Sequence, residues 1–252
     1  MKLGAVPYLN ALPLIHYLPE KPRLAPPAAL DRLLRLGEVD FATAPVTTLF
    51  ENPDYAAIPN LAIGTKGSVR SVRLILKKPG LTLADVGSID LDLESRASAM
   101  LLKVLLHFKY KRDLSQIDFI TPLPSPDPDA VMLIGDKALR DHGASHSLDL
   151  GHEWTSWTKL PFVFAAWIGK NRTCPPGLVN TLQSVRDKAL REIDEVAHAT
   201  NLLPFAEARS YLTENVSYDL SGAELEGLHR FHAYASELKL CPSGFRLRLY
   251  PE

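Results

Sequence analysis

The chain has 252 residues, of which 46% are hydrophobic and 23% are charged, and its 28 Lys and Arg residues nearly balance 29 Asp and Glu residues. This length allows one large domain or two modest ones, and the composition is typical of a globular protein with a sizeable core. The near-neutral charge argues against a protein that binds nucleic acid or a membrane surface, because both functions need a cationic face.

Cysteine content and the N-terminal sequence give further expectations. Cys174 and Cys241 have no CxxC pair or Cys/His cluster around them, so we expect neither a zinc site nor a disulfide framework. The N-terminus lacks a long apolar segment with a small-residue cleavage site. No stretch approaches the ~20 apolar residues of a membrane span. These features together predict a cytoplasmic protein.

The first part of the chain is expected to form strands and a helix. A helix is predicted over 27–36, where leucines share one face and Gly37 provides a C-cap. The β-α-β order of apolar strands favours a parallel sheet covered by helices. Short strands are predicted at four places: 3–6, 39–44, 56–63 and 71–77.

A second α/β unit is expected after the break at 77–80. Residues 88–94 alternate between apolar and acidic side chains, which predicts a strand, and Ser95 then stands as the N-cap of a helix. Further strands are predicted at 119–120 and 130–134, with the proline-rich connector 122–128 between them. The apolar run 160–168 is typical of a fully buried strand.

The last part of the chain is expected to be helical. One helix carries Leu178 and Leu182 on one face, and a second begins at Ser221, where Glu224 three residues later gives a capping-box pattern. The predicted architecture is α/β with two lobes and a ligand cleft between them. Residues 1–84 and 160–252 are predicted to form lobe I, and residues 85–159 lobe II.

Several enzyme classes are disfavoured by missing motifs. The chain has neither G-x-x-x-x-G-K-[ST] nor G-x-G-x-x-G, so we expect no bound nucleotide cofactor. It also has no G-x-S-x-G nucleophile elbow and no H-E-x-x-H zinc helix, and its eight histidines are scattered singly. We therefore expect no metal and no cofactor.

Polar residues lie where predicted strands end or begin. Asn10 follows the first strand beside Tyr8, and its amide can donate a hydrogen bond to a carboxylate or hydroxyl; alternatively, it bonds its own turn. Ser68, Arg70 and Ser71 offer hydroxyls, turn amides and a cation just before a strand; alternatively, they form an exposed loop.

Two more places have the same character. Ser95-Arg96-Ala97-Ser98 opens a helix directly after a strand, which combines free N–H groups, hydroxyls and the helix dipole into an anion site. Asp136 follows another strand and is either an N-cap or a ligand contact. These groups suit a carboxylate-bearing small molecule, and they leave open whether the protein is an enzyme or a solute receptor.

An ordered set of motifs over residues 3–168 resembles the chorismate dehydratases of the futalosine route to menaquinone. The matching stretches are Tyr8-Leu9-Asn10 with Pro13-Leu14, Gly37-Glu38-Val39-Asp40 with Pro45, Gly67-Ser68-Val69-Arg70-Ser71-Val72, Ser95-Arg96 with Ser98, Leu133-Ile134-Gly135-Asp136 with Ala138-Leu139, Asp149-Leu150-Gly151 with Trp154, and Leu160-Pro161-Phe162-Val163-Phe164-Ala165 with Trp167. Pro7, Ala97 and Lys159 depart from the family pattern.

The resemblance implies a periplasmic-binding-protein-like fold of the second type, used as a cytoplasmic enzyme. It also implies that chorismate loses water to give 3-[(1-carboxyvinyl)oxy]benzoate without a cofactor. We predict Asn10 as the catalytic side chain. The predicted substrate-binding residues are Tyr8, Ser68, Arg70, Ser71, Ser95, Arg96, Ala97, Ser98 and Asp136.

Two alternatives to this function are kept. One is the related enzyme that makes 1,4-dihydroxy-6-naphthoate, and the other is a non-catalytic carboxylate-binding protein. The sequence does not determine the oligomeric state.

Overall fold

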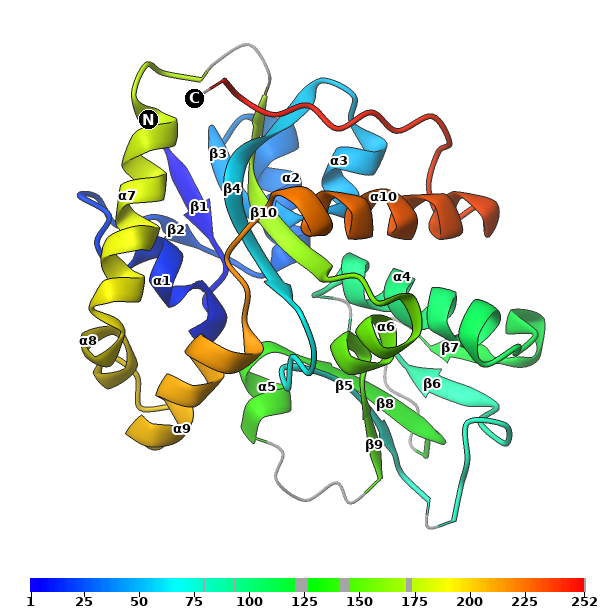
Figure 1. Cartoon of the computed structure of the whole chain (residues 1–252). Helices are drawn as coiled ribbons and strands as arrows, with labels where there is room; N and C mark the ends of the chain where they lie inside the picture. The colour runs from blue at the N-terminus through cyan, green and yellow to red at the C-terminus, as the bar shows by residue number, and fades with distance from the viewer. Residues whose placement is uncertain (79, 93, 121–126, 141–145, 171–173, 252) are drawn as a thin grey trace.

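The computed structural model describes residues 1–78, 80–92, 94–120, 127–140, 146–170 and 174–251. Within these residues the strands form two separate five-stranded sheets, one above the other in Figure 1, with helices around both. None of the described helices is long and apolar enough to cross a membrane. The proline-rich connector predicted at 122–128 lies outside the described residues as far as 126.

Sheet A, the upper sheet in Figure 1, has the order β2-β1-β3-β10-β4. It is mixed rather than parallel as predicted: β1 pairs in parallel with β2 and β3, but β10 runs antiparallel to β3 and β4. The reason is that β10 returns from the second sheet and enters at the edge where β3 and β4 end. The strands of sheet A are β1 (Leu3–Ala5), β2 (Arg23–Leu24), β3 (Phe41–Pro45), β4 (Tyr55–Thr65) and β10 (Phe162–Lys170).

Sheet B, the lower sheet, has the order β7-β6-β8-β5-β9. β6 pairs in parallel with β7 and β8, whereas β5 runs antiparallel to β8 and β9. The strands of sheet B are β5 (Val72–Leu76), β6 (Ser88–Asp90), β7 (Asp118–Ile120), β8 (Ala130–Ile134) and β9 (Ser147–Asp149).

The membership of β5 in sheet B differs from the predicted lobe division at residue 84. The chain passes from sheet A to sheet B over residues 66–71, between β4 and β5, and the break after Leu76 connects two strands of the same sheet. The alternating apolar pattern of a short strand does not predict which sheet the strand joins, because either sheet can bury its apolar face equally well.

Helices surround both sheets. In α2 (Pro27–Leu36) the predicted apolar face is buried, and the helix ends at Gly37 with φ 70°, a left-handed conformation that glycine adopts without strain. The other α-helices are α1 (Leu12–Ile15), α3 (Thr47–Glu51), α4 (Arg96–Val104), α5 (Gly135–Arg140), α6 (Leu150–Thr158), α7 (Leu178–Arg191), α8 (Ile193–His198), α9 (Phe205–Ser210) and α10 (Gly222–Glu237). Shorter 3-10 or π segments are η1 (Leu9–Ala11), η2 (Leu105–Lys109), η3 (Leu114–Gln116) and η4 (Tyr211–Asn215).

The predicted capping box at the start of α10 is not formed. The Ser221 side chain makes no cap bond, and the Glu224 backbone N–H donates to the Ser221 carbonyl instead (2.8 Å). Glu224 is buried, and its carboxylate lies 3.1 Å from the Lys66 ammonium. A buried carboxylate needs a charged partner. Glu224 therefore pairs with Lys66 instead of bonding back to the N-cap residue, as the capping box would require.

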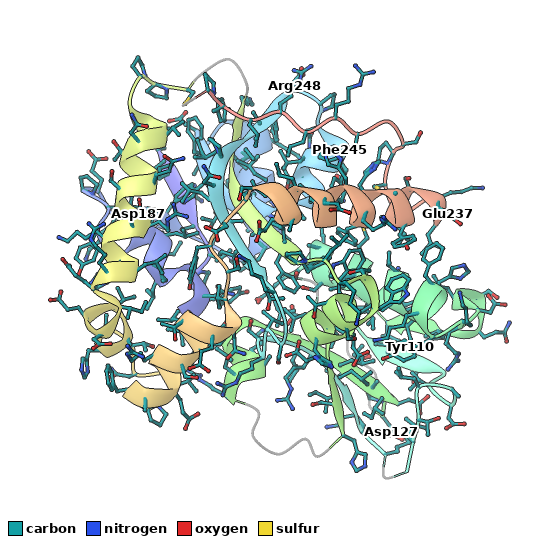
Figure 2. All side chains as sticks on the ribbon, in the orientation of Figure 1. Tyr110, Asp127, Asp187, Glu237, Phe245 and Arg248 are labelled. Carbon is teal, nitrogen blue, oxygen red and sulfur yellow. The ribbon has the colours of Figure 1, made fainter. Side chains whose placement is uncertain are left out.

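The C-terminal segment covers the edge of sheet A. After α10 the chain runs back over the top of the molecule, where Figure 2 labels Phe245 and Arg248. The Ala57 N–H of β4 donates to the Arg248 carbonyl (2.9 Å), and the Tyr250 N–H donates to the Ala57 carbonyl (3.0 Å). These bonds satisfy backbone groups of the edge strand that otherwise face solvent.

Candidate functional site

A cavity lies between the two sheets, where the chain crosses from one to the other. Its volume is about 50 Å³, well below the ~300–1,000 Å³ of typical small-molecule pockets. Val6, Pro45 and Phe164 line it from the side of sheet A, and Val72 and Ile134 line it from sheet B. The two halves of the molecule are therefore closed against each other around this space.

Asn10 lines the cavity from η1, the turn that follows β1. The turn itself is held by the backbone N–H of Ala11, which donates to the Tyr8 carbonyl (3.0 Å). The Oδ1 atom of Asn10 is buried and has no hydrogen-bond partner of good geometry among the described residues. The alternative interpretation, in which Asn10 bonds its own turn, therefore does not match the structure.

Two further side chains meet Asn10 at this place. Ser71 is fully buried in the crossover and lines the cavity, and its hydroxyl also lacks a partner within the described residues. Tyr211, the first residue of η4, is fully buried as well. Burial raises the pKa of Tyr211 well above its usual value, and the adjacent Ser71 and Asn10 side chains partly offset that rise. Sequence reasoning missed Tyr211, because it lies in the helical tail between Ser210 and Leu212 and belongs to no recognised motif.

The N-terminus of α4, where an anion site was predicted, borders the cavity. Ser95 and Ser98 both line it. The Ser95 hydroxyl accepts from the Ser98 backbone N–H (3.2 Å), which confirms the predicted N-cap, and donates to the Ser98 hydroxyl (2.8 Å). Ser98 lines the cavity as well, and its hydroxyl adds a polar group beside the positive end of the helix dipole.

The two residues between these serines do not line the cavity. The Arg96 guanidinium turns outward to Glu51 and to Asp31 (3.5 Å), across to the helices that flank sheet A. Ala97 is fully buried in the core. Arg96 and Ala97 contribute only their backbone N–H groups to the helix terminus. The Arg96 side chain forms a contact between the two halves of the molecule.

Tyr8 forms another contact between the halves. Its ring lines the cavity, and its hydroxyl donates to the Glu94 carboxylate (2.8 Å). Burial, together with this bond to Glu94, raises the pKa of Tyr8 well above its usual value. The ring lies against Gly135, where a Cβ atom would approach it to 2.9 Å, so the end of β8 needs a glycine here.

Asp136 ties the turn of Asn10 to the second sheet. Its carboxylate accepts from the Leu9 backbone N–H (3.0 Å), at the start of η1. Burial raises the pKa of Asp136, opposed by the bond from Leu9 and the charge of Arg140. Asp136 was predicted to be either the N-cap of its own helix or a ligand contact. In the structure its carboxylate instead caps the turn at Leu9, in the other half of the molecule.

Ser68 and Arg70 were predicted at the substrate site, but they do not line this cavity. The Asp149 carboxylate accepts from the Ser68 hydroxyl (2.6 Å), from the Val69 N–H (3.0 Å) and from the Arg70 N–H (2.6 Å). It also caps α6 by accepting from the His152 N–H (2.9 Å). The donors of this turn are thus used internally, and of the predicted crossover residues Ser71 alone reaches the cavity.

The chemical capacity of the cavity follows from these groups. Its described lining holds one amide and several hydroxyls among apolar side chains, and no Lys, Arg, His, Asp or Glu side chain. Such a site can bind a carboxylate through hydroxyl and helix N–H donors. The low polarity of the walls raises the pKa of any carboxylate that loses water on entering. Within the described residues, no cluster of His, Cys, Asp or Glu is placed to hold a metal ion.

Comparison with known sequences identifies relatives. A sequence model described as menaquinone biosynthesis matches residues 1–237. A chorismate dehydratase from Thermus thermophilus is 32% identical over 225 residues, covering 78% of this chain and 80% of the relative. The family match takes in the cavity residues and also Tyr211, which lies beyond the motifs recognised in the sequence.

Comparison with solved structures concerns the fold. The alkanesulfonate-binding protein SsuA from Xanthomonas axonopodis pv. citri, bound to MOPS, has a TM-score of 0.67 and 16% identity, with 96% of this chain and 94% of that chain covered. A Candida albicans gene product described as exhibiting the generic periplasmic binding protein structural fold has a TM-score of 0.56 and 10% identity, with 100% and 98% covered. The predicted periplasmic-binding-protein-like fold is confirmed.

Proposed function

The chain belongs to the menaquinone biosynthesis family, and we propose that it is a chorismate dehydratase, a hydro-lyase that removes water from chorismate to give 3-[(1-carboxyvinyl)oxy]benzoate. The observation that carries this function is the cavity between the sheets, whose described lining offers an amide and hydroxyls but no Lys, Arg, His, Asp or Glu side chain. The 32% identity to the Thermus thermophilus enzyme supports the same reaction. We place the enzyme in the cytoplasm and assign it no cofactor.

Substrate binding begins at the N-terminus of α4. One substrate carboxylate accepts hydrogen bonds from the Ser98 hydroxyl and from the free N–H groups of the first helical turn, where the helix dipole favours negative charge. Asn10 and Ser71 then face the ring and its hydroxyl. Neutral donors hold a dianion without taking up the proton that the reaction must move.

The elimination breaks two bonds of the substrate ring. The C3 proton leaves to a base, its electron pair forms the new ring double bond, and the C4 hydroxyl departs and takes up a proton to become water. Aromatisation of the ring supplies the driving force. The described cavity lining has no Lys, Arg, His, Asp or Glu side chain, and burial keeps the Tyr8 pKa raised so that its hydroxyl stays protonated. A carboxylate of the substrate itself therefore takes the proton, made more basic by the loss of its water.

The closed cavity must open to admit this substrate. About 50 Å³ holds a few water molecules but not a ring with two carboxylates. Opening separates the Tyr8 hydroxyl from Glu94 and the Leu9 N–H from Asp136, which are contacts between the two halves. Closure around the substrate then excludes water and sets the positions of the reacting groups.

The test is direct incubation of the purified protein with chorismate. The ultraviolet spectrum is followed as the benzoate product forms, and mass spectrometry checks for loss of one water. Turnover in the absence of added cofactor supports the proposed reaction. Binding of chorismate without turnover favours a carboxylate-binding protein, and neither binding nor turnover favours the naphthoate-forming alternative; either result overturns the proposal.

A further inference from the structure

Arg96, the first residue of α4, joins the two halves of the molecule at a place that the proposed chemistry does not use. α4 follows β6 of sheet B, whereas α2 and α3 lie beside sheet A in the upper half of Figure 1. The Arg96 guanidinium contacts the Asp31 carboxylate of α2 through Nη1 (3.5 Å) and the Glu51 carboxylate of α3 through Nη2. One planar group therefore contacts two helices of the opposite half at once.

The two carboxylates are held in place without Arg96. The Asp31 side chain is only 8% exposed, and its carboxylate accepts from the Thr48 hydroxyl (2.8 Å) and from Arg35 Nε (2.9 Å). Arg35 also donates to the Glu51 carboxylate through Nη2 (2.8 Å). Both acids therefore keep a charged partner when Arg96 leaves, so opening of the two halves does not strand an uncompensated buried charge.

The charges of these side chains balance only when the halves are closed. With Arg96 in place, two guanidinium groups face two carboxylates. Without it, Arg35 alone faces both acids, and one negative charge is in excess among the four groups. The side chains of Asp31 and Glu51 are mostly buried, so water screens this charge less than it screens an exposed ion pair. The cluster therefore favours the return of a guanidinium.

Arg96 belongs to the same helical turn as the two serines that line the cavity. Ser95 is the N-cap of α4, and Arg96 follows it directly. The turn is closed by the bond from the Ser98 N–H to the Ser95 hydroxyl (3.2 Å). A movement that brings Arg96 to its carboxylate partners therefore brings both serine hydroxyls to the cavity at the same time.

We propose that Arg96 is a positioning residue: its contact with Asp31 and Glu51, the Arg96 latch, holds the closed form and with it the α4 terminus beside the substrate. Arg96 acts through Ser95 and Ser98 and does not touch the substrate. The role of the α4 terminus rests on the proposed function, whereas the latch is a property of the protein without any ligand.

Two backbone N–H groups report on the opening of the halves. The Leu9 N–H donates to the Asp136 carboxylate (3.0 Å), and the Ala28 N–H, in the first turn of α2, donates to the Glu94 carbonyl (3.2 Å). Both bonds run from one half to the other, so these amides exchange their hydrogen with solvent when the halves separate. The Tyr250 N–H, which bonds within the half of sheet A, is the internal reference.

The first test measures amide hydrogen exchange by NMR in the ligand-free wild-type protein and in Arg96→Gln. Exchange at Leu9 and Ala28 should be about fivefold faster in the variant, the upper end of what one partly exposed ion pair contributes, and exchange at Tyr250 should be unchanged. An acceleration of less than twofold at the two amides overturns the latch. An equal acceleration at Tyr250 also overturns it, because the whole fold is then destabilised.

Arg23→Gln is the matched control. It removes the same charge from an ion pair with Glu38 (2.7 Å), but both partners belong to the half of sheet A. Exchange at Leu9 and Ala28 should therefore equal that of the wild type. Acceleration as large as in Arg96→Gln shows that loss of any surface arginine has this effect, and it overturns the inference.

A double-mutant cycle asks whether Arg96 acts through its carboxylate partners. Glu51→Gln by itself should accelerate exchange at Leu9 and Ala28. In the Arg96→Gln background it should cause no further acceleration, because the contact is already lost. Independent, multiplicative effects of the two substitutions overturn the latch.

A kinetic measurement links the latch to the proposed function. With chorismate as substrate, Arg96→Gln should lower kcat/KM about fivefold, since the reactive complex is the closed one, and Arg23→Gln should not change it. An unchanged kcat/KM in Arg96→Gln, together with faster exchange at Leu9 and Ala28, overturns the positioning role. If the wild-type protein does not convert chorismate, the proposed function fails, while the exchange rates still decide whether the latch exists.

Discussion

Two serine-containing turns of similar composition, Ser68-Val69-Arg70-Ser71 and Ser95-Arg96-Ala97-Ser98, have different roles in the folded protein. In the first turn, Asp149 takes up one hydroxyl and two backbone N–H groups. In the second, the two serines bond each other at the start of α4, and both still line the cavity. The first turn is a structural joint between the sheets, although its last residue, Ser71, lines the cavity, and the second is the helix terminus that we propose to bind the substrate.

The difference shows that a set of donors is a binding site only when nothing inside the protein already satisfies it. Asp149 follows the first turn by about 80 residues in sequence, so the turn itself gives no sign that an acid will occupy it. Among the described residues, the carboxylates that pair with Arg96 contact its guanidinium rather than the N–H groups at the α4 terminus. Hydrogen bonds to a charged group are stronger than those between neutral groups. The bonds to the Asp149 carboxylate therefore occupy the donors of the first turn, whereas those of the second turn stay available to a ligand.

The largest effect on turnover is expected at Asn10, beside the turn that remains available. Asn10→Asp keeps the size but places a negative charge opposite a dianion and removes a donor, so kcat should fall ~100-fold. Steady-state assays with chorismate measure this change, and circular dichroism confirms that the variant folds. Near wild-type turnover in a folded Asn10→Asp protein removes Asn10 from the site.

The next effect concerns the turn that Asp149 occupies. Asp149→Ala leaves the Ser68 hydroxyl and the N–H groups of Val69, Arg70 and His152 without their acceptor, and should lower the free energy of unfolding by about 2–4 kcal/mol. Urea denaturation followed by tryptophan fluorescence measures the loss. Asp187→Ala is the control, because Asp187 lies exposed on α7 in Figure 2 and its ion pair with Arg186 contributes little. Equal stabilities of the two variants contradict the joint assigned to Asp149.

A smaller effect distinguishes the two turns by ligand affinity. Ser98→Ala should weaken the binding of a product analogue such as 3-(carboxymethoxy)benzoate by about 1 kcal/mol, which is roughly fivefold, as expected for one lost hydrogen bond to a charged group. Ser68→Ala, its counterpart in the occupied turn, should leave the affinity unchanged. Isothermal titration calorimetry measures both, and the reverse order of effects would invert the roles of the two turns.

The smallest effect is expected at Asp129, a partly buried carboxylate that, like Asp149, accepts from two backbone N–H groups of one turn. The Lys78 ammonium and the Gly87 N–H hold the pKa of Asp129 at about 2, below its usual 3.8. Because the folded-state pKa is lowered, Asp129 stabilises the fold above about pH 4, and this contribution disappears as the pH falls towards 2. Asp129→Asn should flatten that part of the acid unfolding curve and leave turnover at neutral pH unchanged. A curve that does not change shows that solvent screens the group completely.

Local features of the fold were predictable, because residues close in the chain determine them. The leucine spacing of α2 and the glycine at its end need only helix geometry and a left-handed C-cap. The Ser95 cap depends on one residue and the N–H three positions later. Asn10 and the α4 terminus both follow short strands, and the edge where such strands end is where ligands collect in these folds.

Contacts between distant residues were not predictable from pattern alone. Glu224 has the spacing of a capping box, yet it pairs with Lys66 because its carboxylate is buried beside the crossover. Asp136 caps a turn that precedes it by more than a hundred residues. Tyr211 belongs to no recognised motif, and its burial comes from packing of the tail against the rest of the molecule. In each case the partner is brought in by the packing of the two sheets.

By itself, the sequence determined the short apolar strands, the amphipathic α2, the N-cap of α4 and the motifs that place the chain in its family, since hydrophobic period and capping act over a few residues. Only the tertiary structure decided that β5 joins sheet B, that Asp149 occupies the first serine turn, and that Tyr211 is fully buried. The physical reason is that burial and closure of the two halves choose among donors and acceptors that are locally equivalent. That choice depends on which groups lose their water together.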